Sequence, residues 1–194
     1  PKEIAVEAGY AYEVIKNFSV SATFKYLFSD MGRIGNSRGA SSVAFDLGVL
    51  YKCEINDWEG AGWSVGLHVS NLGPKINYLT SKDALPATVK VGGAADLPFL
   101  QMHKLTLTAD LGYRLSPADV QALSVSAGAE YAWRELVMLR GGYHCGDKKK
   151  GDASYATAGA GVEYAGVRLD FAWLFAGHEY LARNTFWVSL GYSF

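Results

Sequence analysis

Hydrophobic and polar residues alternate along nearly the whole chain. The clearest case is residues 41–55, where one set of alternate positions is apolar, from Val43 to Ile55, and the other holds Asp46, Lys52 and Glu54. Successive side chains of a strand point to opposite faces of a sheet, so this period predicts β-strands. The same test predicts eleven strands, at about 3–15, 18–30, 41–55, 63–71, 86–97, 104–115, 121–133, 136–144, 154–164, 167–176 and 184–194.

The contents of the two faces predict where these strands lie. The apolar face ends in aromatic residues on many strands, whereas the other face mixes acids, bases, Gly and Ser. These aromatic residues are Tyr51, Tyr113, Tyr131, Trp133, Tyr164 and Trp173. A tilted membrane-crossing strand needs about 9–11 residues, more than the usual five or six of globular sheets. The pattern predicts an all-β, transmembrane antiparallel β-barrel, multi-pass in the bacterial outer membrane; a soluble β-sandwich is the alternative.

The connections between the strands differ on the two sides of the predicted sheet. One side receives mostly short segments, at 16–17, 56–62, 98–103, 134–135 and 165–166. The other receives mostly longer, charged segments, at 31–40, 72–85, 116–120, 145–153 and 177–183. Short periplasmic turns and long outer loops are typical of outer-membrane barrels. This topology places Cys53 and Cys145 at opposite ends, so both are predicted to be unpaired thiols.

The odd number of strands has its own implication. Bacterial single-chain barrels have an even number of strands, and the first strand here would run inward from the outer side. Either the count is wrong by one strand or strands are missing, and we expect an odd number of further strands, about three, before Pro1. Residues 1–194 are predicted to be a single domain, the C-terminal part of the barrel.

Composition and charge narrow the classes of function. The 194 residues carry a net charge of −1 and a pI of about 6.5, so no nucleic-acid partner is expected. The four histidines fit no zinc or phosphate-loop motif. A general base at His68, near Asp46 or Asp110, and a metal site at His144 and Cys145 are weaker interpretations than solvated histidines. The sequence therefore predicts a protein that is not an enzyme, with no catalytic residue, no metal and no cofactor.

Basic residues gather in the predicted outer loops. They could form a cationic rim that binds lipopolysaccharide or an acidic partner, although four acidic residues dilute the field. The basic residues are Arg33, Arg38, Lys75, Lys82, Lys148, Lys149, Lys150 and Arg183, and the acidic ones are Asp83, Asp147, Asp152 and Glu179.

Residues 70–94, SNLGPKINYLTSKDALPATVKVGGA, are the most distinctive stretch. Asn71, Gly73 and Pro74 end a strand and turn the chain, and Pro86 begins the next strand, where a missing N–H is tolerated. The segment resembles the Asn–x–Gly–Pro–Lys–Ile–x–Tyr stretch, followed by a Pro-led strand, of the PorV and PorQ outer-membrane family, with PorV closer. Weaker similarity continues to the C-terminus, so the resemblance spans about residues 40–194.

The resemblance implies a FadL-like barrel of fourteen strands in the full protein, with about eleven present here. It also implies that the barrel acts in type IX secretion of Bacteroidetes-type bacteria. In that role it binds the C-terminal signal domain of cargo leaving the translocon and carries the cargo to the surface attachment machinery. The implied partners are cargo with a C-terminal β-domain, the translocon and attachment complex, and outer-membrane lipid or lipopolysaccharide. The candidate cargo-binding residues are Arg33, Asn71, Gly73, Pro74, Lys75, Ile76, Asn77 and Tyr78.

Two other functions stay open at this point. A FadL-like channel for hydrophobic small molecules has the same architecture, but it would need an apolar interior, and the predicted inward residues are rich in charge. An acyl hydrolase would need a nucleophile and base pair that the sequence does not offer.

The chain ends in NTFWVSLGYSF, whose alternation finishes on Tyr192 and Phe194. This ending resembles the C-terminal signal that outer-membrane barrels present to the insertion machinery. Deleting Phe194 is expected to lower the amount of chain assembled in the membrane, measured by fractionation, and to leave cargo recognition in the folded fraction intact. Unchanged assembly would make Phe194 an ordinary strand end.

Overall fold

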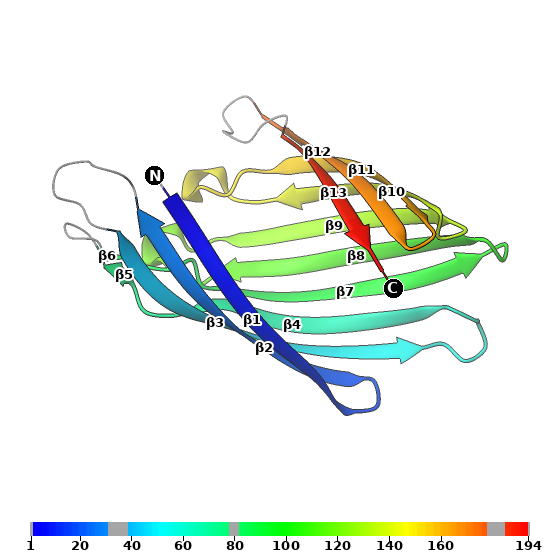
Figure 1. Cartoon of the computed structure of the whole chain (residues 1–194), viewed down its shortest axis with the longest axis horizontal. Helices are drawn as coiled ribbons and strands as arrows, with labels where there is room; N and C mark the ends of the chain where they lie inside the picture. The colour runs from blue at the N-terminus through cyan, green and yellow to red at the C-terminus, as the bar shows by residue number, and fades with distance from the viewer. Residues whose placement is uncertain (1, 31–38, 78–81, 178–184, 194) are drawn as a thin grey trace. The chain divides into compact units, whose positions relative to one another are not determined.

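The computed structural model describes residues 2–30, 39–77, 82–177 and 185–193, and most of them lie in β-strands (Figure 1). Eleven strands form one sheet: β1 (Lys2–Ile15), β2 (Phe18–Asp30), β3 (Ala40–Glu54), β4 (Gly62–Leu72), β7 (Thr88–Phe99), β8 (His103–Arg114), β9 (Leu123–Trp133), β10 (Val137–Cys145), β11 (Tyr155–Tyr164), β12 (Val167–Ala176) and β13 (Phe186–Tyr192). A separate hairpin joins β5 (Ile76–Asn77) to β6 (Lys82–Asp83). Two short 3-10 turns, η1 (Ala118–Val120) and η2 (Lys148–Lys150), complete the described elements.

Each strand of the large sheet lies beside its neighbours in sequence, in the order β1-β2-β3-β4-β7-β8-β9-β10-β11-β12-β13. The pairings with a defined register, from β1–β2 to β12–β13, are antiparallel. All eleven predicted strands are confirmed within a few residues, and so are the predicted all-β class and antiparallel order. A β-sandwich would need a return connection between two sheets, which this order does not contain in the described residues. The β5–β6 hairpin was not predicted, because two-residue strands carry no period.

No helix in the described parts of the chain is long and apolar enough to cross a membrane. Both cysteines are free thiols, as predicted.

Contacts divide the chain into two compact units, described separately below. The first unit contains residues 1–51, 66–91 and 112–122, and the second contains residues 52–65, 92–111 and 123–194. The single-domain assignment stays a prediction.

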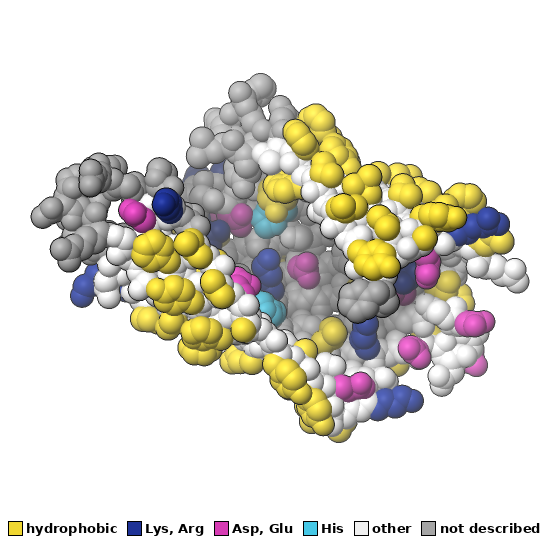
Figure 2. Space-filling view, in the orientation of Figure 1, with side chains coloured by type: hydrophobic (Ala, Val, Ile, Leu, Met, Phe, Trp, Pro, Cys, Tyr) yellow, Lys and Arg dark blue, Asp and Glu magenta, His cyan; other side chains and the backbone are white. Residues whose placement is uncertain are grey.

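In the first unit, the apolar faces of β1, β2 and β3 continue one another. The register pairs Val6 with Tyr26 and Phe24 with Phe45, whose rings meet edge to face at 5.4 Å between centroids. These side chains are exposed: Phe45 is 50% accessible and Val6 59%. Figure 2 shows hydrophobic side chains gathered over this part of the unit. The cross-strand contacts therefore stabilise a surface rather than a core.

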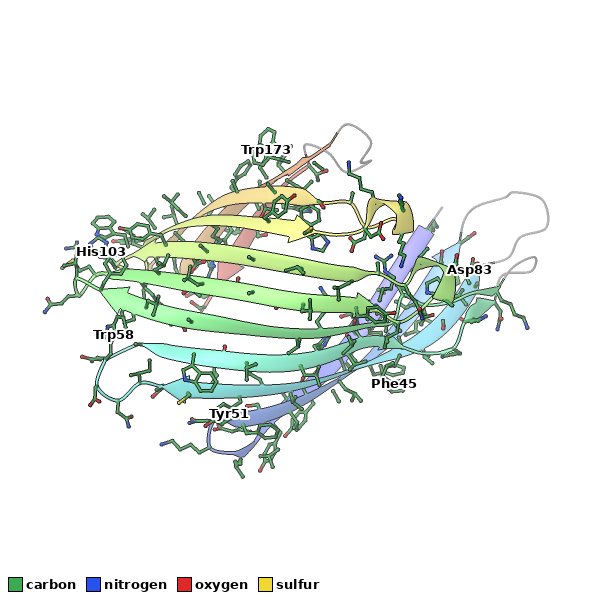
Figure 3. All side chains as sticks on the ribbon, turned by 180° about the vertical axis from the view of Figure 1, so that it is seen from behind. Phe45, Tyr51, Trp58, Asp83, His103 and Trp173 are labelled. Carbon is green, nitrogen blue, oxygen red and sulfur yellow. The ribbon has the colours of Figure 1, made fainter. Side chains whose placement is uncertain are left out.

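In the second unit, β12 and β13 build a similar apolar surface. Leu169 pairs with Leu190 and Trp173 with Phe186, and all four side chains are exposed. Trp173 projects away from the strands (Figure 3), and hydrophobic side chains cover this region in Figure 2.

On the opposite, polar face, small residues lie beneath polar side chains of the neighbouring strands. A Cβ atom added to Gly48 would lie 2.6 Å from the Ser21 hydroxyl, and one added to Gly128 would lie 3.0 Å from the Thr108 hydroxyl. The buried apolar residues are mostly alanines, and no large side chain is fully buried in the described segments. Glycine is therefore used here to let neighbouring polar side chains lie flat against the sheet.

The distribution of exposed apolar and buried polar side chains indicates which environment the fold requires. Full burial of a large apolar side chain contributes roughly 1.5–3 kcal/mol, while a whole domain is stable by only about 5–15 kcal/mol. Many of the chain's large hydrophobic side chains are exposed at once, whereas Asp46 is only 7% accessible. The apolar face therefore has to meet an apolar environment.

Leu169 and Ser189 lie on adjacent strands but on opposite faces, which gives a matched test. We expect Leu169→Arg to destabilise the chain embedded in lipid vesicles by about 2–4 kcal/mol, because a cation on the apolar face loses its hydration there. Ser189→Arg adds the same charge opposite Asp170 and should change stability by less than about 1 kcal/mol. Urea titration of vesicle-embedded protein, followed by tryptophan emission, measures both; equal losses would contradict the assignment of faces.

Candidate functional site

The predicted site begins where β4 ends, at Asn71. Its backbone is left-handed, with φ of 58°, a conformation that Asn tolerates better than most residues. The Asn71 N–H donates to Asp46 Oδ1 at 2.8 Å, and its side-chain amide donates to the Pro86 carbonyl at 3.2 Å. Asn71 therefore joins three parts of the chain: β3, the end of β4 and the segment that leads into β7.

The Lys25–Asp46 ion pair on the polar face contacts Asn71 through both of its members. Lys25 Nζ of β2 lies 2.7 Å from Asp46 Oδ2 of β3, and it also donates to Asn71 Oδ1 at 3.4 Å. The side chains of Lys25 and Asp46 are 16% and 9% accessible, and Glu7 of β1 approaches Lys25 at 3.8 Å. Because the pair is largely covered, removing one partner would leave a poorly hydrated charge.

Gly73 and Pro74 hold the following residues against β3. A Cβ atom at Gly73 would overlap the carbonyl oxygen of Val43 and lie 2.9 Å from Leu85 Cδ1. The Ser42 hydroxyl donates to the Pro74 carbonyl at 3.1 Å. Leu85 is 7% accessible, and close packing at this point requires glycine.

The remaining predicted residues fall into two groups. Lys75 and Asn77 are exposed, as is the ring of Pro74, while Ile76 is half-buried and pairs with Asp83 across the β5–β6 hairpin. Arg33 and Tyr78 lie outside the described residues. The structure thus brings Asn71 to Asn77 together as one anchored segment, with its base on β3 and its later residues accessible.

Several residues that hold this segment were not among the predicted site residues. They are Lys25, Ser42, Asp46, Leu85 and Pro86. The alternation places Asp46 on the polar face, but it does not show that Asp46 meets Asn71, which lies 25 residues further along the chain. The available signal was one polar residue on each of two neighbouring strands, Asp46 inside β3 and Asn71 near the end of β4.

A second group of charges lies on the polar face of the other unit. Arg140 of β10 donates to Glu130 of β9 and to Asp170 of β12, and Arg168 Nε donates to Asp170 Oδ2 at 2.8 Å. The Arg140–Asp170 contact crosses β11 above Gly161, where an added Cβ atom would lie 3.1 Å from Arg140 Nη1. Glycine at this position leaves room for the ion pair.

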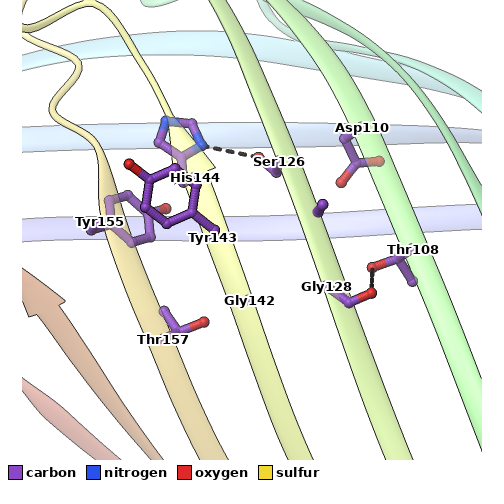
Figure 4. A pocket seen from close by; sticks show the side chains of 10 residues that line it. Thr108, Asp110, Ser126, Gly128, Gly142, Tyr143, His144, Tyr155 and Thr157 are labelled. Atoms are coloured by element: carbon purple, nitrogen blue, oxygen red, sulfur yellow. Dashed lines mark hydrogen bonds between the residues drawn. The ribbon is translucent and has the colours of Figure 1, made fainter.

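His144 lies in a row of polar side chains beside a small cavity of about 230 Å³ (Figure 4). Its Nδ1 shares a hydrogen bond with the Ser126 hydroxyl at 2.9 Å, and its Nε2 lies 3.0 Å from Asp152 Oδ1. The ring also stacks on Tyr155. Ser126 and His144 are register partners of the β9–β10 ladder. Backbone N–H groups within a ladder are bound to the next strand, so they do not form an oxyanion hole for acyl transfer.

No cluster of three or more metal-binding side chains occurs in residues 2–30, 39–77, 82–177 and 185–193. His144 and Cys145 are consecutive strand residues, so their side chains point to opposite faces and do not share one ion.

The sheet has an exposed apolar face and a charged, glycine-lined polar face. These two faces are typical of outer-membrane β-sheet proteins, which is the class that the fold indicates. The chain belongs to the PorV family: the family model described as "Type IX secretion system protein PorV" matches residues 1–121. The match includes the whole segment 70–94 and confirms the predicted family; it also reaches residue 1, beyond the start of the resemblance seen in the sequence. No curated protein matches the chain. The family is one of secretion proteins, not of enzymes.

The contact of Gly73 with β3 can be tested with a single methyl group. Gly73→Ala is expected to destabilise the packing of the segment by roughly 1–3 kcal/mol, because the new Cβ atom overlaps the Val43 backbone. Gly141→Ala on β10 is the control, since nothing lies within 4 Å of its added Cβ atom. Limited proteolysis after Lys75 or Lys82 should accelerate only for Gly73→Ala; equal cleavage of both variants would contradict the anchoring.

Proposed function

We propose that this chain forms part of the wall of a transmembrane β-barrel in the bacterial outer membrane. There it takes part in type IX secretion by binding the C-terminal signal domain of cargo proteins and carrying them to the surface attachment machinery. Membership of the PorV family supports the pathway. The exposed apolar face supports the membrane location, because such a face is stable against hydrocarbon and unstable in water.

The anchored segment from Asn71 to Asn77 is the observation that carries the cargo-binding proposal. Its base is fixed by the contacts to Asp46, Ser42 and Val43, so the exposed residues after it are presented with little freedom to move. Binding loses less entropy when the binding loop is already ordered.

The β5–β6 hairpin offers a suitable surface for a β-domain. It forms its own two-stranded sheet, so each strand has an edge that is not part of the large sheet. Such an edge can pair with an extended strand of a partner, in which case main-chain hydrogen bonds provide affinity and side chains provide specificity. Lys75 and Asn77 are exposed beside this edge, and Arg33 and Tyr78 are also proposed as cargo-binding residues.

The basic residues of η2 support a further contact, with lipopolysaccharide. Lys148 and Lys149 are exposed, and the Asp147 side chain caps the turn by accepting from the Lys149 N–H. Phosphate groups of lipopolysaccharide would pair with these ammonium groups. The translocon and attachment complex are proposed as the other partners of the chain.

A channel for hydrophobic small molecules is less well supported. The polar face carries the Arg140 cluster with Glu130 and Asp170, and it carries the Lys25–Asp46 pair. An apolar ligand beside these groups would remove water from charges without replacing their hydrogen bonds.

Site-specific photo-cross-linking tests the cargo proposal. A photoreactive residue at Asn77 is expected to capture secreted proteins that share a C-terminal β-domain. The control is the same residue at Asp57, an exposed position before the start of β4, at the other end of that strand. Capture of cargo from Asn77 but not from Asp57, detected by mass spectrometry, supports the proposal. Capture only of lipid at Asn77, or equal capture at both positions, would falsify it.

A further inference from the structure

A larger cavity lies where several turns of the second unit come together. Its volume is about 510 Å³, within the roughly 300–1,000 Å³ of small-ligand sites. The lining residues are Gly60, Pro98, Gln101, Met102, His103, Lys104, Ala132, Arg134 and Glu135. They come from the turn before β4, the β7–β8 turn and the β9–β10 turn with the adjoining strand ends.

Cross-turn hydrogen bonds hold these walls in place. The indole N–H of Trp58 donates to the Pro98 carbonyl at 2.9 Å, and the Arg134 N–H donates to the Met102 carbonyl at 2.6 Å. Arg134 Nε also points at Met102 Sδ, at 3.0 Å. The cavity is therefore bounded by connected turns.

The turns keep large side chains where glycine would be less strained. Leu100, Gln101, Arg134 and Glu135 all have positive φ angles, between 49° and 57°. A non-glycine residue in this region costs roughly 1–2 kcal/mol, and tight hairpins usually use Asn-Gly there. Strain of this kind is characteristic of functional sites, and here it displays a cation and an anion side by side.

The rim of the cavity is aromatic on the apolar face of the strands. The His103 ring stacks on Phe99 at 5.4 Å, and its Nδ1 bonds the Tyr131 hydroxyl at 2.6 Å. The Arg134 guanidinium lies 5.3 Å from the centre of the Trp133 ring. His103 and Trp58 lie at the same end of the sheet (Figure 3). Aromatic rings that hold a cation beside an apolar surface are typical of the level of lipid headgroups.

The charges of the lining indicate which headgroup fits. Lys104 is already paired with Asp96 at 3.1 Å, which leaves Arg134 as the available cation and Glu135 as the available anion. A phosphate ester suits the guanidinium, and an ammonium group suits the carboxylate. Leu100 is 79% accessible and Met102 45%, so acyl chains would find apolar contacts beside the cavity.

We propose that this cavity binds the zwitterionic headgroup of an aminophospholipid, with the phosphate on Arg134 and the ammonium group on Glu135. His103 and Trp133 form the aromatic side of the site, and the acyl chains lie on the apolar face near Leu100. The site goes beyond cargo binding, and it rests on the membrane location proposed above.

Native mass spectrometry of the delipidated chain in detergent tests this site. The probes are phosphatidylethanolamine, phosphatidylcholine and phosphatidylglycerol with identical acyl chains. We expect phosphatidylethanolamine to be retained best. Arg134→Gln should weaken its binding about tenfold, since a charge-assisted bond to phosphate is lost. Glu135→Gln should remove the preference for phosphatidylethanolamine over phosphatidylglycerol.

Lys16→Gln is the matched control, because it removes an exposed positive charge from the turn between β1 and β2 that does not line the cavity. It should leave lipid retention unchanged. Equal retention by wild type and Arg134→Gln, or an equal loss with Lys16→Gln, would overturn the site. Soluble phosphoethanolamine binding as tightly as the lipid would also overturn it, in favour of a free phosphate ester.

This outcome is separate from that of the proposed function. Cross-linking of cargo from Asn77 should be unchanged in Arg134→Gln. Failure of lipid retention with cargo capture intact would reject only the lipid site. A chain that stays monodisperse without detergent would reject the membrane location itself.

Discussion

The structure depends on one constraint: every second side chain of each long strand must meet an apolar environment. Because the backbone of a strand alternates, the polar side chains are then forced onto one face, where they have to satisfy one another. The Lys25–Asp46 pair in one unit and the Arg140–Asp170 pair in the other are the results of this requirement. Their charges are opposite in sign and adjacent, which limits the free energy lost when they leave bulk water.

The small residues of the polar face are the second half of the same design. An ion pair that reaches from β10 to β12 must pass over β11, and it does so above Gly161. Gly48 and Gly128 lie under hydroxyl groups in the same way. At Gly161, charge pairing and glycine placement are therefore one feature, because the ion pair needs the space that glycine leaves.

The sequence predicted the strands well because the period of two is strong over ten or more residues. It also predicted which face each side chain lies on. Phe45 and Asp46 are consecutive residues of one strand, so their side chains point to opposite faces, Phe45 to the apolar face and Asp46 to the polar face. The family was recognisable from residues 70–94, which the family model covers. The segment's attachment to the sheet was not predictable, because Asp46, Ser42 and Leu85 meet it through contacts between distant parts of the chain. The cavity beside Arg134 was missed for a different reason: its β7–β8 and β9–β10 turns carry no glycine or asparagine signal, although two consecutive residues in each have positive φ.

The glycines of the polar face also affect how this protein can change over generations. The glycine and alanine positions of this face have almost no side-chain volume left to remove, so single substitutions at these positions can only add atoms. Each addition at a position such as Gly161 or Gly128 pushes against a polar partner before it fills free space. Divergence among descendants of this chain is then easier on the apolar face, where one apolar residue can replace another, while the small residues of the polar face are retained.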